Sequence, residues 1–464
     1  LDAKGIEVEK LLEENKDLKV RVNMNSQNSS KPPSSDGYKK PAPKSLRVKT
    51  DKKRGGQPGH PGRTITVPSD PDEIVVHPPK NCTVCPMFSE CSSQNRFSCS
   101  ESRYVVDAVV LTKVTEHRSV TVAECPLGIA VDDKGEFPEN VKARVQYGDG
   151  FVQLCSTLNT YGAMSVSRIS ALVKGMFGVT ISEGTVQSMT SRCAELVRPT
   201  MKKVRELLIK SDVVNFDETG VRVDNKLAWV HDSSNKHYTY LTVHAKRGKD
   251  GMDANGVLPR FKGIAVHDCL KTYWKYLKMT HATCGAHFLR ELEGIESHGT
   301  GHRWPKLFRD LLLLMKRSKE REQEAGSDRF PEKEIEAFSK EYDRVMMLAD
   351  RECPPPKEPR KKTRGRMRKG KERSLIERLQ SLKGSVMMFA TDFRVPFDNN
   401  QAERDVRNVK VKAKVAGCFR TMSGAEDYLS IMSYIGTARK HGIDGFKALA
   451  LVFKGRPDDI LIFS

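Results

Sequence analysis

The sequence lacks any long hydrophobic run. A helix that crosses a bilayer needs about 20 consecutive, predominantly apolar residues, and charges interrupt every apolar stretch of the 464 residues before that length is reached. The first residues also lack the basic segment and short apolar segment of a secretory signal. We therefore expect an intracellular protein without a membrane span.

Acidic residues are in short supply relative to basic ones. The chain has 79 Lys and Arg against 59 Asp and Glu, which gives a net charge of +20 and a pI near 9.4. An excess of this size favours a polyanionic partner, and nucleic acid is the commonest one. A merely basic soluble protein is the alternative. The length exceeds that of one compact core and predicts about two to four domains.

Closely spaced cysteine pairs are scarce, although the chain has eleven cysteines. In an intracellular chain, clustered cysteines are better interpreted as metal ligands than as disulfides. Cys82 and Cys85 in CTVC have zinc-knuckle spacing, and Cys125 lies further along. A structural zinc site takes four ligands, and the fourth is left open among Cys91, Cys99 and His117. We take Cys99 as the working choice, with scattered reduced cysteines as the alternative interpretation.

The N-terminal part divides by composition into three segments. Residues 1–24 carry apolar residues at helical spacing, which fits a short dimerising coiled coil or a helix packed on its own domain. Residues 25–65 are rich in Ser, Asn, Pro, Gly and Lys, and we expect a disordered basic linker that can lie along phosphates. Residues 66–135 form the predicted zinc-binding segment.

Residues 136–210 are predicted to be a helical DNA-binding domain. The stretch SVSRISALVKGMFGVTISEGTVQSMTSRCAEL contains two helical patterns separated at Gly178 and Val179, and Ser182 is placed to cap the second helix. This is helix-turn-helix spacing, in which the second helix enters the major groove. A helical hairpin within an ordinary core is the alternative.

From Val213 the apolar period changes to two. The segments VVNFDETGVRV, KLAWVHDS and HYTYLTVHAKRG predict three consecutive strands. A helical segment near 253–261 precedes a fourth strand in GIAVHDC, and HATCGAH predicts a fifth. Three antiparallel strands followed by alternating helix and strand is the order of the ribonuclease-H-like fold. We therefore predict an α/β class with a mixed five-stranded sheet, whose first part is residues 211–287.

The rest of the chain is predicted to be helical. Residues 288–392 form an expected insertion into the core, and residues 393–464 complete the core with C-terminal helices. A basic loop at 357–373 holds ten Lys and Arg against two Glu. Such a loop cannot pack a core, but it can neutralise phosphates. The DNA contacts predicted there are Arg364, Arg366 and Arg368.

Three carboxylates follow the pattern of two-metal phosphodiester chemistry. Such sites hold two Mg²⁺ or Mn²⁺ ions ~3.5–4 Å apart by carboxylates from different elements. Asp217 follows the apolar run VVNF, Asp268 ends the fourth strand, and Glu403 lies in the first turn of a late helix. The first and fourth strands are neighbours in the predicted sheet, so the two aspartates would lie side by side. Any one of these residues alone is usually a solvated carboxylate.

A basic stripe accompanies the third carboxylate. Arg404 follows it directly, and Arg407, Lys410 and Lys414 continue at helical spacing. This stripe predicts contact with the DNA backbone, and a salt-bridged surface helix is the alternative.

Supporting roles are predicted for three further residues. Cys284 and His287 form C-x-x-H at the end of the fifth strand and are expected to orient Asp268 or the DNA. Asn399 or Asn400 is expected to cap the helix of Glu403. Glu218 is left out of the metal set because strand alternation turns it to the opposite face.

Long motifs resemble the insertion sequence 66 family of bacterial transposases over nearly the whole chain. They include NSSKPPSSDG, GGQPGHPGR, VQYGDG, DETGVRV, KLAWVH, AKRGKDGMDA and DFRVPFDNNQAERDVRNVKVKAKVAGCFR. The resemblance implies a DDE active site, which maps onto Asp217, Asp268 and Glu403. It also implies an N-terminal zinc-binding segment, a helical insertion before the glutamate, and accessory proteins of the same mobile element. Two positions depart from the family pattern: Cys125-Pro-Leu-Gly replaces a second CxxC, and Cys269 stands where Gly is more usual.

The function expected from this resemblance is DNA transposition. The protein would bind the terminal inverted repeats as a homo-oligomer, cut a strand with two Mg²⁺ or Mn²⁺ ions, and join it to target DNA. It would be cytoplasmic and nucleoid-associated in a bacterium. A catalytically silent or co-opted DNA-binding protein is the alternative, and a metal nuclease of another biological role is a third option.

Overall fold

The computed structural model describes most of the chain in two compact units. The described residues are 70, 72–91, 99, 101–106, 111–120, 134–297, 301–355 and 370–461. One unit comprises Lys44–Thr115, and the other comprises Leu1–Pro43 with Glu116–Ser464. The smaller unit contains the short helix α2 (Lys80–Thr83) and the turn η2 (Phe88–Glu90). The helix predicted at 1–24 and the linker at 25–65 lie outside the described residues.

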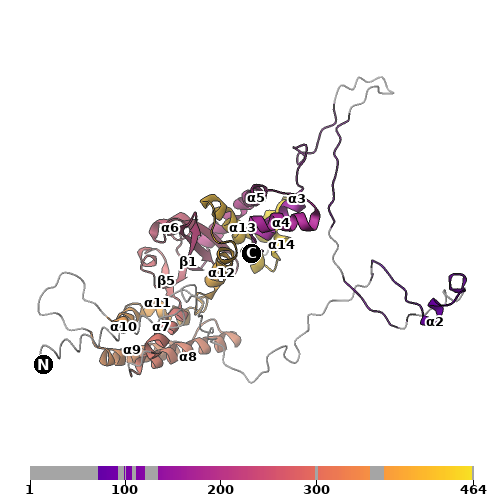
Figure 1. The fold of residues 1–464 in the computed structure, drawn as a ribbon. Coiled ribbons are helices and arrows are strands. Elements are labelled where there is room, and N and C mark those ends of the chain that lie inside the picture. The colour runs from indigo at the N-terminus through magenta and orange to yellow at the C-terminus, as the bar shows by residue number, and fades with distance from the viewer. Residues whose placement is uncertain are drawn as a thin grey trace, which may run out of the picture. The chain divides into compact units, whose positions relative to one another are not determined.

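A mixed five-stranded sheet lies at the centre of the larger unit (Figure 1). Its strands are β1 (Val213–Val223), β2 (Lys226–Ser234), β3 (Thr239–His244), β4 (Ile264–His267) and β5 (Thr280–Thr283). The spatial order is β3-β2-β1-β4-β5, with β1, β2 and β3 antiparallel and β1, β4 and β5 parallel. The predicted α/β class and its five strands are confirmed.

Local sequence explains the ends of these elements. Asp224 and Asn225 both have positive φ, the conformation of a tight hairpin turn, and they join β1 to β2. Helix α6 (Lys249–Asn255) begins and ends earlier than predicted, because Gly256 at φ +79° terminates it. The predicted fifth strand is also shorter, because helix α7 (Gly285–Ser297) already begins within its sequence.

Helices cover both faces of the sheet. Helix α12 (Asn400–Ala416) packs against β1 and β2, and α13 (Met422–Lys440) packs against β3. On the other face, Asn255 of α6 accepts a hydrogen bond from Ser233 of β2. The turn η4 (Tyr273–Lys275), helix α14 (Gly445–Phe453) and the turn η5 (Pro457–Leu461) complete this core.

In the described part of the larger unit, the sheet is preceded by α3 (Asp149–Asn159), α4 (Val166–Phe177) and α5 (Glu183–Ile209). The predicted break is confirmed, since Gly178 ends α4 at φ +67° and the Ser182 hydroxyl accepts a hydrogen bond from Thr185 N at 3.0 Å. Helix α5 is long. Its N-terminal part packs on α3 and α4, and its C-terminal part enters the core of the sheet with Val204 and Leu208.

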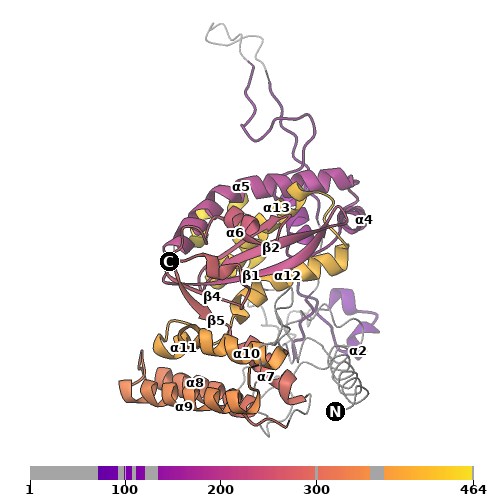
Figure 2. The same ribbon diagram turned by 90° about the vertical axis from the view of Figure 1, so that its left-hand side faces the viewer.

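Between β5 and α12 the chain forms helices that share a second hydrophobic core with one end of the sheet, including Val266 and Ala282. The helices are α7, α8 (Trp304–Glu324), α9 (Glu332–Glu352), α10 (Lys371–Ser381) and α11 (Lys383–Thr391). Trp304, Phe308 and Tyr342 are fully buried there. Helices α8 and α9 lie side by side, and α10 and α11 lie between them and the sheet (Figure 2).

The predicted basic loop at 357–373 is shorter than expected. Its last three residues belong to α10, and Arg373 is buried, donating to Asp350 Oδ1 at 2.6 Å and Glu377 Oε1 at 3.3 Å. Arg373 is therefore part of the helical core rather than of a DNA-contacting loop. Arg364, Arg366 and Arg368 lie outside the described residues.

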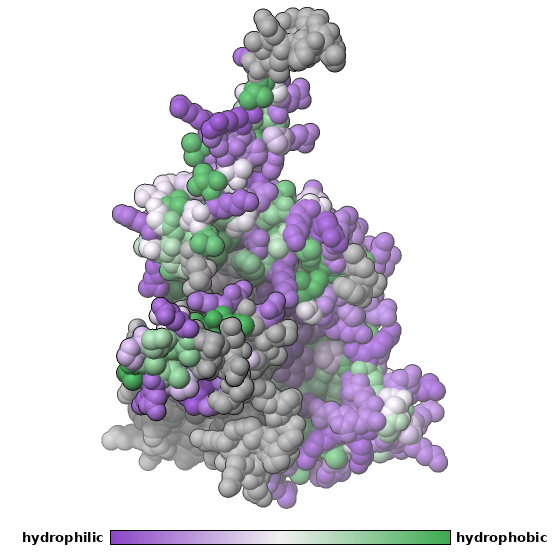
Figure 3. Space-filling view, turned by 90° about the vertical axis from the view of Figure 1, so that its right-hand side faces the viewer, coloured by the Kyte–Doolittle hydropathy of each residue, from purple (hydrophilic) through white to green (hydrophobic). Residues whose placement is uncertain are grey.

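The described surface is mixed in polarity. Hydrophilic and hydrophobic residues alternate over the face shown in Figure 3. Residues 101–106 and 111–120 expose several large apolar side chains, including Val105 at 92%, Val114 at 88% and Leu111 at 83%. These side chains belong to none of the hydrophobic cores. Among the described helices, none combines the length and apolar character needed to cross a membrane.

Candidate active site

Asp217 lies on β1, and Asp268 directly follows the neighbouring parallel strand β4. The register pairs Asn215 of β1 with Val266 of β4, and each aspartate comes two residues later in the chain. Asp217 Oδ1 accepts from the Glu218 backbone N at 2.9 Å, and Asp268 Oδ1 accepts from Leu270 N at 2.8 Å. The predicted proximity of these two residues is thus what the sheet produces.

The electrostatics of this pair are those of crowded carboxylates. Burial raises the pKa of Asp217 well above its ordinary range. Three neighbouring carboxylates raise it further, those of Glu218, Asp268 and Glu403. Burial also raises the pKa of Asp268 to about 6, with a further contribution from Glu218. Each ionised carboxylate disfavours ionisation of its neighbours, and a nearby cation would reduce the repulsion between them.

The start of α12 is anchored to the sheet by Asn399. Its side-chain amide donates to Phe216 O at 2.8 Å and accepts from the Asn215 amide at 2.7 Å. Its backbone N donates to Cys284 Sγ at 3.1 Å. The predicted side-chain cap is wrong: Asn399 makes no capping bond, and Asn400 is the first helical residue. The side chain that would cap the helix instead ties it to β1, which places Glu403 near Asp217.

The Glu403 carboxylate is paired with an arginine. Arg290 Nη2 lies 3.3 Å from Glu403 Oε1, with side chains 24% and 37% exposed. Within the described part of the chain, no group of three or more His, Cys, Asp or Glu lies close enough to hold a metal ion. The charges of Asp268 and Glu403 therefore act on Asp217, but the three carboxylates do not converge on one point in this structure.

The C-x-x-H pair lies where β5 leads into α7. Cys284 follows β5, and burial raises the pKa of its thiol to about 12. It contacts Asn399 rather than Asp268. His287 lies in the first turn of α7, where burial lowers its pKa to about 3. Its Nδ1 is buried without a hydrogen-bond partner among the described residues.

Glu218 lies on the opposite face of β1, as strand alternation predicted. Its Oε1 accepts from Arg247 Nη2 at 2.6 Å and its Oε2 accepts from the Tyr273 hydroxyl at 2.7 Å. The sequence contains no signal for these partners, because they lie 29 and 55 residues away. Glu218 is therefore paired with Arg247, and its charge still raises the pKa of both Asp217 and Asp268.

Sequence reasoning missed a second acidic group beneath α12. Asp232 of β2 stands directly opposite Asp217 in the strand register. Burial raises its pKa well above the ordinary range, and Asp405 raises it further. Asp405 accepts from Lys440 Nζ at 2.7 Å and from the Thr239 hydroxyl at 3.0 Å. The alternation of KLAWVHDS was the available signal, since it places Asp232 on the same face as Asp217.

The basic stripe of α12 faces solvent. Arg404, Arg407 and Lys414 are exposed, and Lys410 is half-buried. Lys412 is buried, and its ammonium donates to two backbone carbonyls, Asn159 O at 2.9 Å and Met164 O at 2.7 Å. The helix thus packs through one side and presents cations on the other.

The cysteine segment is described only in part. The backbone N of Cys85 donates to Cys82 O at 3.2 Å, and Cys91 follows η2. Cys99 Sγ lies 3.3 Å from Ser102 Oγ. Cys125 lies outside the described residues, so the predicted four-ligand set is not tested.

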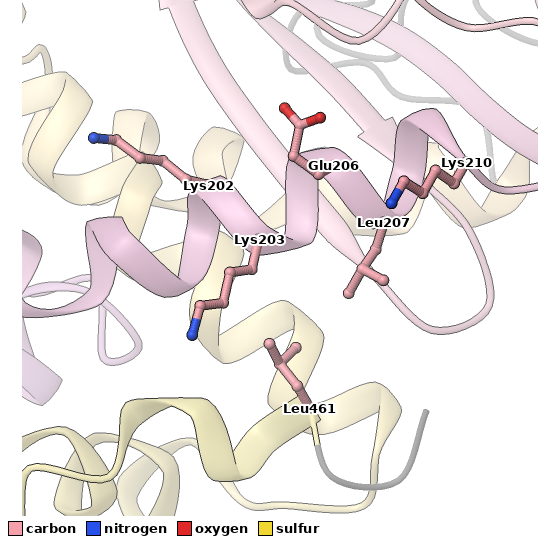
Figure 4. Close-up of a pocket in the computed structure, with 6 residues that line it drawn as sticks. All are labelled: Lys202, Lys203, Glu206, Leu207, Lys210 and Leu461. Carbon is pink, nitrogen blue, oxygen red and sulfur yellow. The ribbon is translucent and has the colours of Figure 1, made fainter.

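A surface hollow lies away from the carboxylates. It has a volume of about 460 Å³ and is formed by α5 and the end of η5 (Figure 4). Its lining residues are Lys202, Lys203, Glu206, Leu207, Lys210 and Leu461. None of the predicted site residues lines it.

These features define an α/β protein with partly buried, mutually repelling carboxylates beside a cationic helix. The family model described as Transposase IS66 family matches residues 144–427, which include Asp217, Asp268 and Glu403. The chain belongs to this family, and it is therefore a transposase-family protein that acts on DNA. A family of unknown function (DUF6444) matches residues 4–65. The search of curated proteins returned no match.

Proposed function

We propose that the chain is a DDE transposase that binds the ends of its insertion sequence and cuts and joins DNA strands. The observation that carries this proposal is the placement of three carboxylates. Asp217 lies on β1, Asp268 follows the neighbouring parallel strand β4, and the start of the Glu403 helix is tied to β1 through Asn399. The strand order β3-β2-β1-β4-β5 supports a ribonuclease-H-like core. The helices between β5 and α12 then correspond to the predicted insertion.

The donor set suits a hard divalent cation. Carboxylate oxygens are the ligands that Mg²⁺ and Mn²⁺ prefer, and bound cations would offset the repulsion between the three carboxylates. Asp217, Asp268 and Glu403 would hold two such ions. When bound, these ions supply activation of the attacking water and stabilisation of the leaving oxygen.

The chain's own residues position the reactants. In the first step water attacks a phosphodiester, and the 3′ oxygen leaves and takes a proton. In the second step that 3′ hydroxyl loses its proton and attacks a phosphodiester of the target DNA. The 3′ oxygen of the target strand leaves and takes a proton, and a new 3′–5′ phosphodiester forms. The Asn399 anchor sets the position of Glu403, and the exposed cations of α12 hold DNA phosphates nearby. DNA reading by α4 and α5, a homo-oligomeric assembly and accessory proteins are further parts of the proposal.

A structural zinc ion is proposed for the cysteine segment. Its ligands would be Cys82, Cys85 and Cys125, with the fourth among Cys91, Cys99 and His117. The tight turn from Cys82 to Cys85, closed by a backbone hydrogen bond, is compatible with this assignment. Metal analysis of the purified protein is expected to find one zinc per chain, and its absence would rule the site out.

Incubation of the protein with the end sequences of its mobile element and Mg²⁺ tests the main proposal. Cleaved strands and joined products are expected, and both should disappear when the metal is chelated. A protein that binds the ends tightly but never cuts them would instead be a co-opted DNA-binding protein.

A further inference from the structure

We infer that Arg290 is the resident counter-ion of Glu403. When Glu403 binds a metal ion, Arg290 releases the carboxylate, and its guanidinium then binds a DNA phosphate. This inference rests on the proposed function. Arg290 lies in α7, the helix that follows β5, while Glu403 lies in the first turn of α12. Their 3.3 Å contact joins two elements that are 113 residues apart at the position of the third carboxylate.

The pair has the features of an exchangeable contact. The bond joins one guanidinium nitrogen to one carboxylate oxygen at 3.3 Å, at the long end of the hydrogen-bond range, and both side chains are partly exposed. The Arg247–Glu218 pair provides the contrast: two guanidinium nitrogens donate to one carboxylate that is only 1% exposed. Arg247 is therefore fixed, whereas Arg290 is held by a single charged contact.

The arginine is also the cation that a metal ion would have to replace. Two positive charges repel each other strongly at such short range, so a divalent ion bound by Glu403 drives the guanidinium away. Arg290 Nε donates to Ala286 O of its own helix at 3.3 Å, which keeps the side chain beside the site after the exchange. A guanidinium with its remaining donors free matches the oxygens of a phosphate.

Calorimetric titration of the metal-free, full-length protein with Mn²⁺, without DNA, tests the first half of the inference. Arg290→Ala is expected to bind Mn²⁺ about two- to fivefold more tightly than wild type, since loss of a partly exposed ion pair removes the competition. Arg290→Gln, which keeps a polar hydrogen-bonding side chain but removes the charge, should give the same shift if the alanine variant folds poorly. In a Glu403→Gln background the Arg290 effect should vanish, because the two residues act on one another.

Cleavage of end DNA tests the second half. Both Arg290 variants are expected to cut roughly tenfold or more slowly at saturating Mn²⁺, because a phosphate contact is lost. Tighter metal binding together with slower cleavage distinguishes this role from a structural one. Loss of a purely structural residue would weaken metal binding and slow cleavage alike. Arg309→Ala is the matched control: Arg309 pairs with Glu296 at 2.8 Å with side chains 26% and 24% exposed, and both measurements should stay at wild-type values.

Unchanged or weaker Mn²⁺ binding by the Arg290 variants would overturn the inference while leaving the proposed function intact. A wild-type protein that binds no Mn²⁺ would overturn both, because there would be no metal for Arg290 to compete with. Faster cleavage by Arg290→Ala would also overturn it, since the guanidinium would then act only as an inhibitor.

Discussion

Asp268 lowers the stability of the metal-free protein because its charge is buried near other carboxylates. Its pKa is about 6 in the folded protein against an ordinary value of 3.8. A raised folded-state pKa contributes stability that is fully present below the unfolded pKa and is lost as the pH rises through the folded pKa. The loss therefore falls between about pH 4 and pH 6 and persists above that window.

Asp268→Asn is expected to raise the thermal unfolding temperature of the metal-free protein at pH 7. The variant and wild type should converge as the pH falls below about 4, where the wild-type carboxyl becomes protonated in both states. Thermal unfolding followed by circular dichroism in the presence of a chelator, from about pH 3 to about pH 8, is the measurement. Asp250→Asn is the control, because Lys246 lowers the pKa of exposed Asp250 and no gain is expected there. An Asp268→Asn variant less stable than wild type at pH 7 would contradict the account.

At the scale of elements, α12 connects the site to the rest of the fold. Its first turn is tied to β1 through Asn399. Its later part is tied through Lys412 to the last residue of α3 and to the segment that follows it. Asn399 and Lys412 are both buried, 1% and 7% exposed. Changes at either residue should therefore move the helix rather than merely alter its surface.

Asn399→Ala is expected to cost about 1–3 kcal/mol of unfolding free energy, because it leaves the buried Phe216 carbonyl and Asn215 amide without their partner. It should also slow strand cleavage while leaving DNA affinity nearly unchanged, since the cations of α12 remain. Denaturant unfolding, cleavage rate and DNA binding would be measured together. Asn400→Ala is the neighbouring control and should be milder in all three. Equal effects of the two substitutions would remove the special role of Asn399.

Elements with a local signal were predicted well. The alternating residues of β1 to β3 and the break at Gly178 depend on neighbours in sequence, and both appear in the structure. The Asn399 anchor joins residues 183 and 184 positions apart, so local pattern favoured an ordinary helix cap instead. The Glu403–Arg290 pair was missed for the same reason: periodicity indicates that a side chain faces a site, but it does not indicate which cation reaches it.

At the scale of the whole molecule, the net charge of +20 predicts binding to DNA through its phosphates. Replacing Arg364, Arg366 and Arg368 with Ala should weaken binding to all sequences alike. It should also reduce the slope of log affinity against log salt by up to about 3, since each lost phosphate contact removes about 0.9. Binding would be measured across a salt series on end DNA and unrelated DNA.

Arg373 provides the control for the loop. It is buried between Asp350 and Glu377, so Arg373→Ala should lower stability and leave the salt slope unchanged. Loss of affinity for end DNA alone in the triple variant would contradict a backbone contact.

The most direct test of the central claim is strand cleavage of end DNA by Asp217→Asn, Asp268→Asn and Glu403→Gln. Each substitution keeps the shape of the side chain and removes one ligand charge. Each variant should therefore lose orders of magnitude in cleavage rate while its DNA affinity stays near wild type. Glu218→Gln should be milder, because Glu218 is bonded to Arg247 and Tyr273 on the other face. Cleavage by Glu403→Gln at the wild-type rate would contradict the assignment of the third carboxylate and would turn attention to Asp405 and Glu426.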